Sequence, residues 1–456
     1  MVRRLSLVAA VLALGAIGAS AAGGSSPSAW SAAATIHTCG SASDPRVVFP
    51  YSLPTARSGH GAILWLGAAP GCPRSGATRL DSATLHSDDQ PSAPRALSSA
   101  ASLSAPLEVA GTTVGQVVAV VGERSGAVLG EAPAGYPLTN LRQLGGPADE
   151  VATAVGWIGD ADVVSTASLH GGEAIELRAQ RHYARSFAAP VIMREGSAQI
   201  SSLTVAMDFR ADSIVLWVAG GELHAQWVSN DGRPNGPQVL GPAGYDTQVG
   251  AVLSDNNHAF VIWTDQPAPG HGGTTAIFLD HSGPNVVFSG RPRVLTTFTQ
   301  PAAQRLGPGA VALVRETPSE GVLAAWTLVQ GSNYVVQAAG LTSHTVLPAA
   351  TIAQQGADLR LAALATGPRD DVVAVLERAP RTSSGFDSAQ QAILAARTVP
   401  GGPGGVAFET PAQLAAPGPN GEVSVAVDPD SDQAVVAWQT QSGGSARVDY
   451  AVRSGP

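Results

Sequence analysis

The chain has 456 residues, of which only 13% are charged, and its 35 acidic residues outnumber 26 basic ones, for a net charge of −9. Every basic residue is an arginine, which excludes lysine Schiff-base chemistry and lysine general bases. A net negative chain without basic stripes is also unlike nucleic-acid-binding proteins, so no nucleic acid is expected as a partner.

Residues 1–21 have the pattern of a secretory signal peptide. Two arginines precede an apolar stretch over residues 5–17, and small residues at 19–21 form a cleavage site. The apolar stretch is too short to span a bilayer and no later run reaches that length, so no transmembrane segment is expected after signal removal. Residues 22–34 are small and turn-prone and predict a flexible leader. We therefore expect a protein secreted to the extracellular space or the cell envelope.

The only two cysteines are Cys39 and Cys72. In an exported protein, an even and minimal cysteine count favours one disulfide. This bridge would join the N-terminal segment to the first repeat. Two free buried thiols are the alternative.

A short apolar run recurs eight times along the chain. Its clearest copies end in Trp217, Trp263, Trp326 and Trp438. The eight runs end at positions 65, 120, 166, 217, 263, 326, 375 and 438, so that one follows another every 46 to 63 residues. A period of this length with β-type residues indicates a β-propeller. The tryptophans are predicted to fill the core between sheets rather than to stack on a ligand.

Each run is predicted to be the second of four strands in one unit. The fourth unit reads as strands over 203–207, 213–219, 222–228 and 237–240. The eighth unit repeats this pattern with strands over 423–427, 434–439 and 446–452, and then stops one strand short.

An N-terminal strand, over either 35–38 or 46–49, is expected to complete the eighth unit and close the ring. The predicted fold class is therefore all-β: a single propeller domain over 35–456 with eight four-stranded blades, or seven as the alternative. An open solenoid is the competing architecture. Small residues in the first strands, such as Val425-Ala426, suit strands that converge on a central channel.

Aspartate-rich turns follow several of the predicted first strands. The segment 428–432 begins like a calcium loop but has Gln433 and Gln439 where such a loop has glycine and glutamate. We interpret it, and the similar segment 208–212, as solvated hairpin turns. The histidines and cysteines lack zinc spacing. No metal and no cofactor are expected.

Candidate site residues lie in the loops that follow the second strands. In a propeller these loops share a face with the loops that join successive units, and long loops on a rigid scaffold carry binding sites. The low-charge sequence offers the following ligand-binding candidates: Glu123, Asp265, His271, Glu377, Arg378 and Arg381. The acidic members are interpreted either as a carboxylate cluster for glycoside hydrolysis or as solvated residues paired with arginine.

The repeated Val-Val-x-Trp strand, glycine-containing turn and Pro-x-x-Leu tail resemble units of secreted sialidase-like β-propellers. The tails include 237–240 and 411–414, and the resemblance covers the architecture of residues 45–456. Ser229-Asn230-Asp231-Gly232 begins like the family's Asp-box, Ser-x-Asp-x-Gly-x-x-Trp, but lacks the closing aromatic residue. The family's catalytic motifs are not matched, so no catalytic residue is carried over.

The leading hypothesis from the sequence is a secreted, monomeric, non-enzymatic propeller that binds a protein or a glycan. The alternative is a carbohydrate-active hydrolase or lyase that uses acidic loop residues. A further alternative is a structural spacer domain.

Overall fold

The computed structural model describes residues 29–36, 42–50, 61–67, 79–85, 91–97, 103–111, 116–123, 128–133, 139–143, 148–156, 159–181, 184, 186–254, 257–268, 270–283, 287–301, 306–307, 309–315, 321–331, 333–342, 345–352, 358–369, 371–382, 385–399, 406–442 and 445–454. Both cysteines and residues 1–21 lie outside these ranges, so the disulfide and the signal peptide stay predictions. Within these ranges, no helix has the length and hydropathy needed to cross a membrane.

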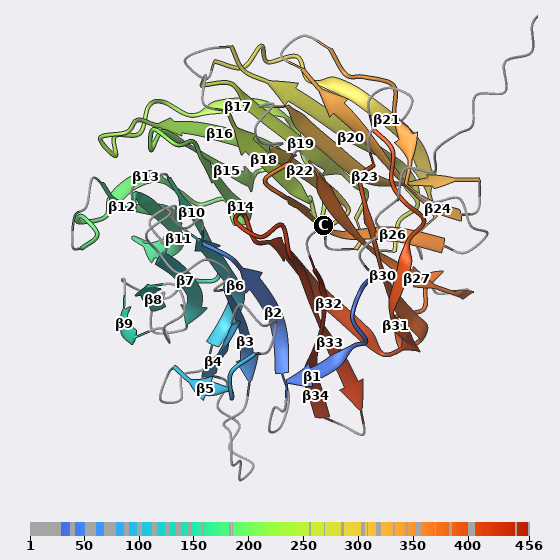
Figure 1. Cartoon of the computed structure of the whole chain (residues 1–456). Coiled ribbons are helices and arrows are strands. Elements are labelled where there is room, and N and C mark those ends of the chain that lie inside the picture. The colour runs from blue at the N-terminus through green and yellow to red at the C-terminus, as the bar shows by residue number, and fades with distance from the viewer. Residues whose placement is uncertain are drawn as a thin grey trace, which may run out of the picture.

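The described strands form eight four-stranded antiparallel sheets, called blades here, arranged radially around a common centre (Figure 1). This confirms the predicted all-β propeller with eight blades. A two-stranded hairpin and one short 3-10 helix are inserted in blade 7. In blades 1 to 7 the strands follow one another in chain order outward from the centre, because consecutive strands pair as antiparallel neighbours.

From the inner strand outward, blades 1 to 4 contain the following strands: β2(Ala42–Val48), β3(Gly61–Gly67), β4(Arg79–Leu85) and β5(Arg95–Ala96); β6(Leu103–Gly111), β7(Gln116–Glu123), β8(Val128–Pro133) and β9(Thr139–Gln143); β10(Val151–Val155), β11(Ala161–Leu169), β12(Gly172–Gln180) and β13(Val191–Gly196); β14(Ile200–Met207), β15(Ser213–Ala219), β16(Glu222–Val228) and β17(Gln238–Pro242).

Blades 5 to 8 contain the following elements: β18(Val249–Leu253), β19(Ala259–Asp265), β20(Gly273–His281) and β21(Arg293–Gln300); β22(Val311–Arg315), β23(Val322–Gln330), β24(Asn333–Leu341) and β25(Ala350–Thr351); β26(Asp358–Thr366), β27(Val372–Ala379), β30(Gln391–Arg397) and β31(Ala412–Gly418), with the inserted β28(Arg381–Thr382), β29(Gly385–Phe386) and η1(Ser388–Gln390); β32(Asn420–Val427), β33(Ala434–Ser442), β34(Ser445–Arg453) and β1(Ala34–Ile36).

The N-terminal strand closes the ring, as predicted from the missing fourth strand of the last unit. β1 pairs antiparallel with β34, with Thr35 opposite Asp449, and Figure 1 shows the two strands side by side. The pairing continues upstream, where Trp30 forms a bridge with Arg453. Of the two candidate segments, the first supplies the closing strand through Thr35 and Ile36, while its residues 37–38 lie outside the described ranges; the second, 46–49, belongs mainly to β2. The inner strands contact one another around the whole ring, including β32 with β2.

The hydrophobic core is divided into clusters that fill the gaps between adjacent blades. Each tryptophan of the repeated run lies in the gap between its own blade and the preceding one. Trp217, for example, packs with Val164 and Ile175 of blade 3. The five tryptophans of the second strands are between 0% and 3% exposed. They fill the wide gaps where flat sheets diverge from the centre, so their predicted role as core residues is confirmed.

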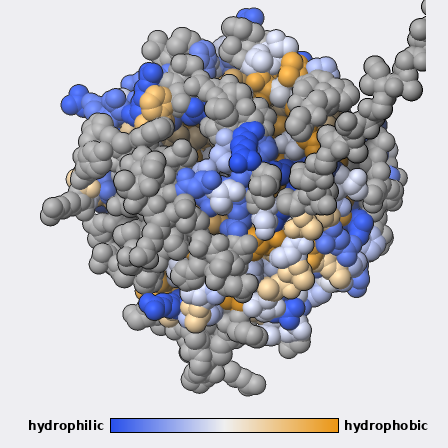
Figure 2. Space-filling view, in the orientation of Figure 1, coloured by the Kyte–Doolittle hydropathy of each residue, from blue (hydrophilic) through white to orange (hydrophobic). Residues whose placement is uncertain are grey.

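Close approach of the inner strands explains their small residues. A Cβ added at Gly250 in β18 would lie 3.2 Å from the Cα of Ala312 in β22. Larger side chains on this side of the strand would push the two strands apart. Toward the middle of the ring, hydrophilic side chains gather on the face seen in Figure 2.

The aspartates that open and close these turns are buried, whereas tip residues such as Arg210 and Asp430 are exposed, so the expectation of wholly solvated turns is corrected in part. Asp208 and Asp428 are 2% and 1% exposed. Oδ1 of Asp208 accepts hydrogen bonds from the backbone N–H groups of Arg210 and Asp212, at 2.8 and 2.9 Å. The turns are therefore built around the carboxylates, because a buried polar group is stable only when its hydrogen bonds are satisfied.

Candidate functional site

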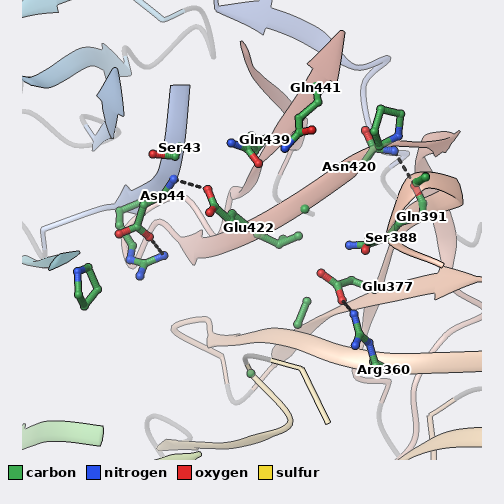
Figure 3. Close-up of a pocket in the computed structure, with 18 of the residues that line it drawn as sticks. Ser43, Asp44, Arg360, Glu377, Ser388, Gln391, Asn420, Glu422, Gln439 and Gln441 are labelled. Atoms are coloured by element: carbon green, nitrogen blue, oxygen red, sulfur yellow. Dashed lines mark hydrogen bonds and ion pairs between the residues drawn. The ribbon is translucent and has the colours of Figure 1, made fainter. Parts of the chain in front are cut away.

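The main hollow of the described structure lies where inner strands begin and second strands end. It has a volume of about 990 Å³. Its lining comes mostly from blades 1, 7 and 8, with smaller contributions from blades 2, 5 and 6. The lining side chains labelled in Figure 3 are polar: Ser43, Asp44, Arg360, Glu377, Ser388, Gln391, Asn420, Glu422, Gln439 and Gln441.

Two inner strands carry a β-bulge where they enter the main hollow. The pairing register shifts around Asp44 in β2 and Glu422 in β32, and the backbone φ angles there are 51° and 44°. Non-glycine residues rarely adopt a positive φ, and surrounding contacts must hold them there. Because a bulge redirects a side chain from the regular strand alternation, both carboxylates are available to this wall (Figure 3).

These two carboxylates also join three blades. Oε2 of Glu422 accepts a hydrogen bond of 2.5 Å from the backbone N–H of Asp44, linking blade 8 to blade 1. Oδ2 of Asp44 accepts a hydrogen bond of 2.5 Å from the backbone N–H of Leu107 in blade 2. Oδ1 of Asp44 forms an ion pair with Arg46 at 2.7 Å. Charge-assisted bonds of this kind are stronger than neutral ones, so this wall is preorganised.

Another wall of the main hollow contains a buried ion pair. Glu377, in β27, is 8% exposed, and its Oε2 accepts a hydrogen bond of 3.0 Å from Nη2 of Arg360 in β26. Burial raises the pKa of the Glu377 carboxyl, and Arg360 opposes that shift. The Arg360 guanidinium lies 3.6 Å from the ring centroid of Phe386. A buried carboxyl with a shifted pKa at the edge of a hollow is typical of functional sites.

Amide and hydroxyl groups complete the main hollow. The Nδ2 of Asn420 donates to the carbonyl oxygens of Gln391 and Ala416, at 2.6 and 2.9 Å, so this amide holds the scaffold. In contrast, Gln441 and Ser388 are exposed at the rim. Their side chains carry both donors and acceptors, the combination that a hydroxyl-bearing ligand requires.

A second hollow of about 860 Å³ lies on the same face, over blades 3, 4 and 5. Its lining includes Glu150, Ser202, Tyr245 and Asp246. Ser202 stands at a further bulge with φ 56°, and its Oγ donates to the carbonyl oxygen of Thr247 in the next inter-blade connection at 2.6 Å. Burial raises the pKa of the Glu150 carboxyl, and a hydrogen bond with the backbone of Leu203 opposes that shift. Pro106 and Gln248 line both hollows, which therefore meet.

The candidates from the sequence are distributed around this face. Glu377 lines the main hollow. Asp265, at the end of β19, lies beside Gly244 of the second hollow; burial raises its pKa, and a hydrogen bond with the Gly244 backbone opposes the shift. The structure therefore separates these two carboxylates: Glu377 lines the main hollow, whereas Asp265 lies next to the second hollow without lining it.

The other candidates lie outside the described lining of both hollows. His271 is exposed in the loop after β19. Nη2 of Arg378 donates to Oε1 of Gln413 in β31 at 2.7 Å. Glu123 ends β7 and Arg381 begins β28, and the side chains of these two residues lie outside the described part of the chain.

Sequence reasoning missed the inner-strand residues of the main hollow, above all Asp44, Arg360 and Glu422. A usable signal was present for two of them. Arg360 directly precedes Leu361-Ala362, and Glu422 stands shortly before Val425-Ala426. Such small-residue pairs mark inner strands, so polar residues just before them are expected at the mouth of the channel.

Within the described residues, no group of three or more histidine, cysteine, aspartate or glutamate side chains is arranged to hold a metal ion. The carboxylates of the main hollow are instead engaged with arginines or backbone N–H groups.

No protein-family model and no curated protein sequence matches the chain. Similar solved structures include a fungal AA5-family alcohol oxidase in complex with copper (10% identity, 94% of this chain and 77% of that chain, TM-score 0.47). They also include the polysaccharide lyase Uly1 (8% identity, 75% and 88%, TM-score 0.43) and Trypanosoma rangeli sialidase (11% identity, 81% and 56%, TM-score 0.34). The propeller architecture on which the predicted resemblance rests is confirmed by the eight four-stranded blades themselves.

Proposed function

We propose that this protein is a secreted β-propeller that binds a glycan in its main hollow without altering it chemically. The proposal depends on one observation: polar side chains from several blades converge on a hollow whose volume, about 990 Å³, suits a ligand of several rings. The buried apolar side chains, in contrast, pack in the gaps between blades.

The chemistry of the lining supports a hydroxyl-rich ligand. Carboxylate oxygens accept hydrogen bonds, while amide and hydroxyl groups both donate and accept them. Glu422, Gln441 and Ser388 supply one of each kind. A sugar ring presents hydroxyl groups that need both donors and acceptors. The strained bulges hold the carboxylates in place before a ligand arrives, which reduces the entropy lost on binding.

Secretion is part of the proposal. The signal-like pattern of residues 1–21 and the low charge of the chain support it. Expression of the full chain in a secreting host, followed by N-terminal sequencing of protein recovered from the medium, tests it. Retention of an uncleaved chain inside the cell would contradict this part.

The binding proposal is tested by a glycan array with the purified mature chain, followed by affinity measurement on each hit. Gln441→Ala with Ser388→Ala removes two exposed polar groups of the rim and should weaken binding. Gln143→Ala is the matched control, because Gln143 is an exposed glutamine on the outer strand β9. Binding that survives the double substitution unchanged would place the ligand elsewhere. Failure to retain any glycan would leave a protein partner or a spacer role.

A second candidate function, glycoside hydrolysis or lyase chemistry, is favoured by one observation. Figure 3 shows Glu377 and Glu422 facing the same space from different blades, and burial raises the pKa of Glu377, the direction of shift found for general acids in paired-carboxylate sites. Polysaccharides should then release shortened products, and Glu377→Gln should abolish release while leaving retention intact. Product release by the wild-type chain would overturn the non-enzymatic proposal.

A further inference from the structure

We infer that the two hollows form one trough that binds a linear oligosaccharide without negative charge. This inference rests on the proposed glycan-binding function and specifies its ligand class. The first step is continuity. Pro106 of blade 2 and Gln248, which precedes β18 of blade 5, line both hollows. Together the two hollows draw their lining from strands of blades 1, 2, 4, 5, 7 and 8 and from the connections that lead into blades 3 and 6, so they extend across the ring.

The size of the trough excludes a monosaccharide as its full ligand. Each hollow alone, at about 990 and 860 Å³, lies near the upper end of the range of roughly 300–1,000 Å³ that holds a single small molecule. A ligand that fills both must therefore be a chain of several sugar units.

The charge of the lining determines which classes of oligosaccharide the trough can bind. In the main hollow, Arg46 is paired with Asp44 at 2.7 Å and lies 3.7 Å from Glu108, and Arg360 is paired with Glu377 at 3.0 Å. Both guanidinium groups are thus already neutralised, while Glu422 adds a further carboxylate.

The second hollow likewise has more acidic than basic groups in its described lining. Its described lining contains Glu150 and Asp246 and no basic side chain. Like charges placed together across an interface weaken binding and reject the wrong partner. The trough should therefore repel glycans that carry uronate, sulfate or sialate groups and accept neutral or cationic ones.

The two hollows offer different contacts to such a chain. The described lining of the main hollow contains no aromatic side chain and contacts sugars through hydrogen bonds. In the second hollow, the Tyr245 side chain is 56% exposed, and its backbone N–H donates to the carbonyl oxygen of Gln266 at 3.0 Å. The bond fixes the backbone at Tyr245, and the exposed aromatic ring offers a flat apolar face to a sugar ring.

The test measures affinity by calorimetry for three oligosaccharide series of two to eight units: neutral cello-oligosaccharides, cationic chitosan oligosaccharides and anionic oligogalacturonates. Affinity for at least one of the first two series should rise with length until the trough is full, whereas the oligogalacturonates should bind more weakly at every length. Tyr245→Ala should weaken binding of the longest ligands by about two- to tenfold. It should leave a dimer bound in the main hollow unaffected.

Phe209→Ala is the matched control, because Phe209 is a 36% exposed aromatic residue in the β14–β15 turn and lines neither hollow. Affinity that does not increase with length, unchanged binding of the longest oligomer to the Tyr245→Ala variant, or preference for oligogalacturonate would overturn the inference while leaving glycan binding intact. Absence of binding in all three series together with an array that shows no retained glycan would instead refute the proposed function itself.

Discussion

Replacement of Arg397 by methionine should destabilise the joint between blades 7 and 8. Arg397 ends β30 and is 8% exposed. Its Nη2 contacts Oδ2 of Asp371 at 2.5 Å in blade 7 and forms a closer ion pair with Oδ2 of Asp432 in blade 8. Asp432 is 1% exposed. Methionine keeps much of the volume and removes the charge, which leaves two carboxylates buried without their counter-ion.

Removal of one partner of a buried ion pair costs about 3–5 kcal/mol in the free energy of unfolding. The entropy of unfolding is about 2.1 cal/mol/K per residue, hence about 0.8 kcal/mol/K for roughly 400 folded residues, so the melting temperature should fall by roughly 4–6 °C. Differential scanning calorimetry at pH 7.5 measures this shift.

The difference in melting temperature between Arg397→Met and the wild type should become smaller at lower pH. Burial raises the pKa of Asp432, Asp371 adds to the shift, and Arg397 opposes it. A raised pKa means that the folded chain binds more protons than the unfolded chain between the two pKa values, so stability falls as pH rises through that window. Without Arg397 the pKa of Asp432 is raised further, so this pH window extends to higher pH. The variant should therefore approach the wild type as pH is lowered from 7.5 toward about 4, near the ordinary aspartate pKa.

Two further variants test whether the unpaired buried carboxylates cause the loss of stability. Addition of Asp432→Asn to Arg397→Met should restore part of the lost melting temperature, because it removes one buried charge. Arg233→Met is the matched control, since the side chain of Arg233 is 85% exposed in its ion pair with Asp231, and its melting temperature should not change. Equal melting of Arg397→Met and the wild type at pH 7.5, or a deficit that grows at pH 4, would refute this account.

Three other perturbations test the ring. Trp217→Ala should lower the free energy of unfolding by about 3–5 kcal/mol in urea titrations, because Trp217 is 0% exposed between blades 3 and 4; a loss below about 1 kcal/mol would contradict its core role. Gly309→Ala should lower the melting temperature more than Gly220→Ala. Both glycines have a positive φ, but a Cβ at Gly309 would lie 2.1 Å from the carbonyl oxygen of Ala362, whereas the space at Gly220 is open; equal effects would show that only φ matters. A chain that starts at Ala42 lacks β1 and should self-associate in size-exclusion chromatography with light scattering, because the edge of β34 is uncovered; an unchanged monomer would contradict the closure.

The apolar run was sufficient to predict the second strands, since it reports burial on both faces. The predicted second strand over 213–219 coincides with β15, and the third strand of the same unit, predicted over 222–228, coincides with β16. First strands were less well bounded. The structure extends the one predicted over 423–427 to Asn420–Val427, because its beginning carries polar residues and a bulge that break the apolar pattern.

The site was predictable only in part for the same reason. Glu377 follows a recognisable apolar run within the second strand β27, and its position at the loop-bearing face is a consequence of strand direction. Asp44 and Glu422 reach the main hollow through bulges with positive φ, which depend on contacts between blades and not on local sequence. The aspartate-rich turns were misjudged because their composition fits both a solvated turn and one folded around a buried carboxylate.

The closing strand has a consequence for how the protein matures. Oγ1 of Thr35 in β1 donates to Oδ1 of Asp449 in β34 at 2.6 Å, across 414 positions of sequence. Contacts of such separation form late, because the intervening chain must be ordered first. During synthesis from the amino end, β1 has no partner until almost the entire polypeptide has emerged. A chain interrupted before β34 cannot complete its last blade and retains unpaired backbone at that blade, which distinguishes it physically from a finished molecule and exposes it to proteolysis.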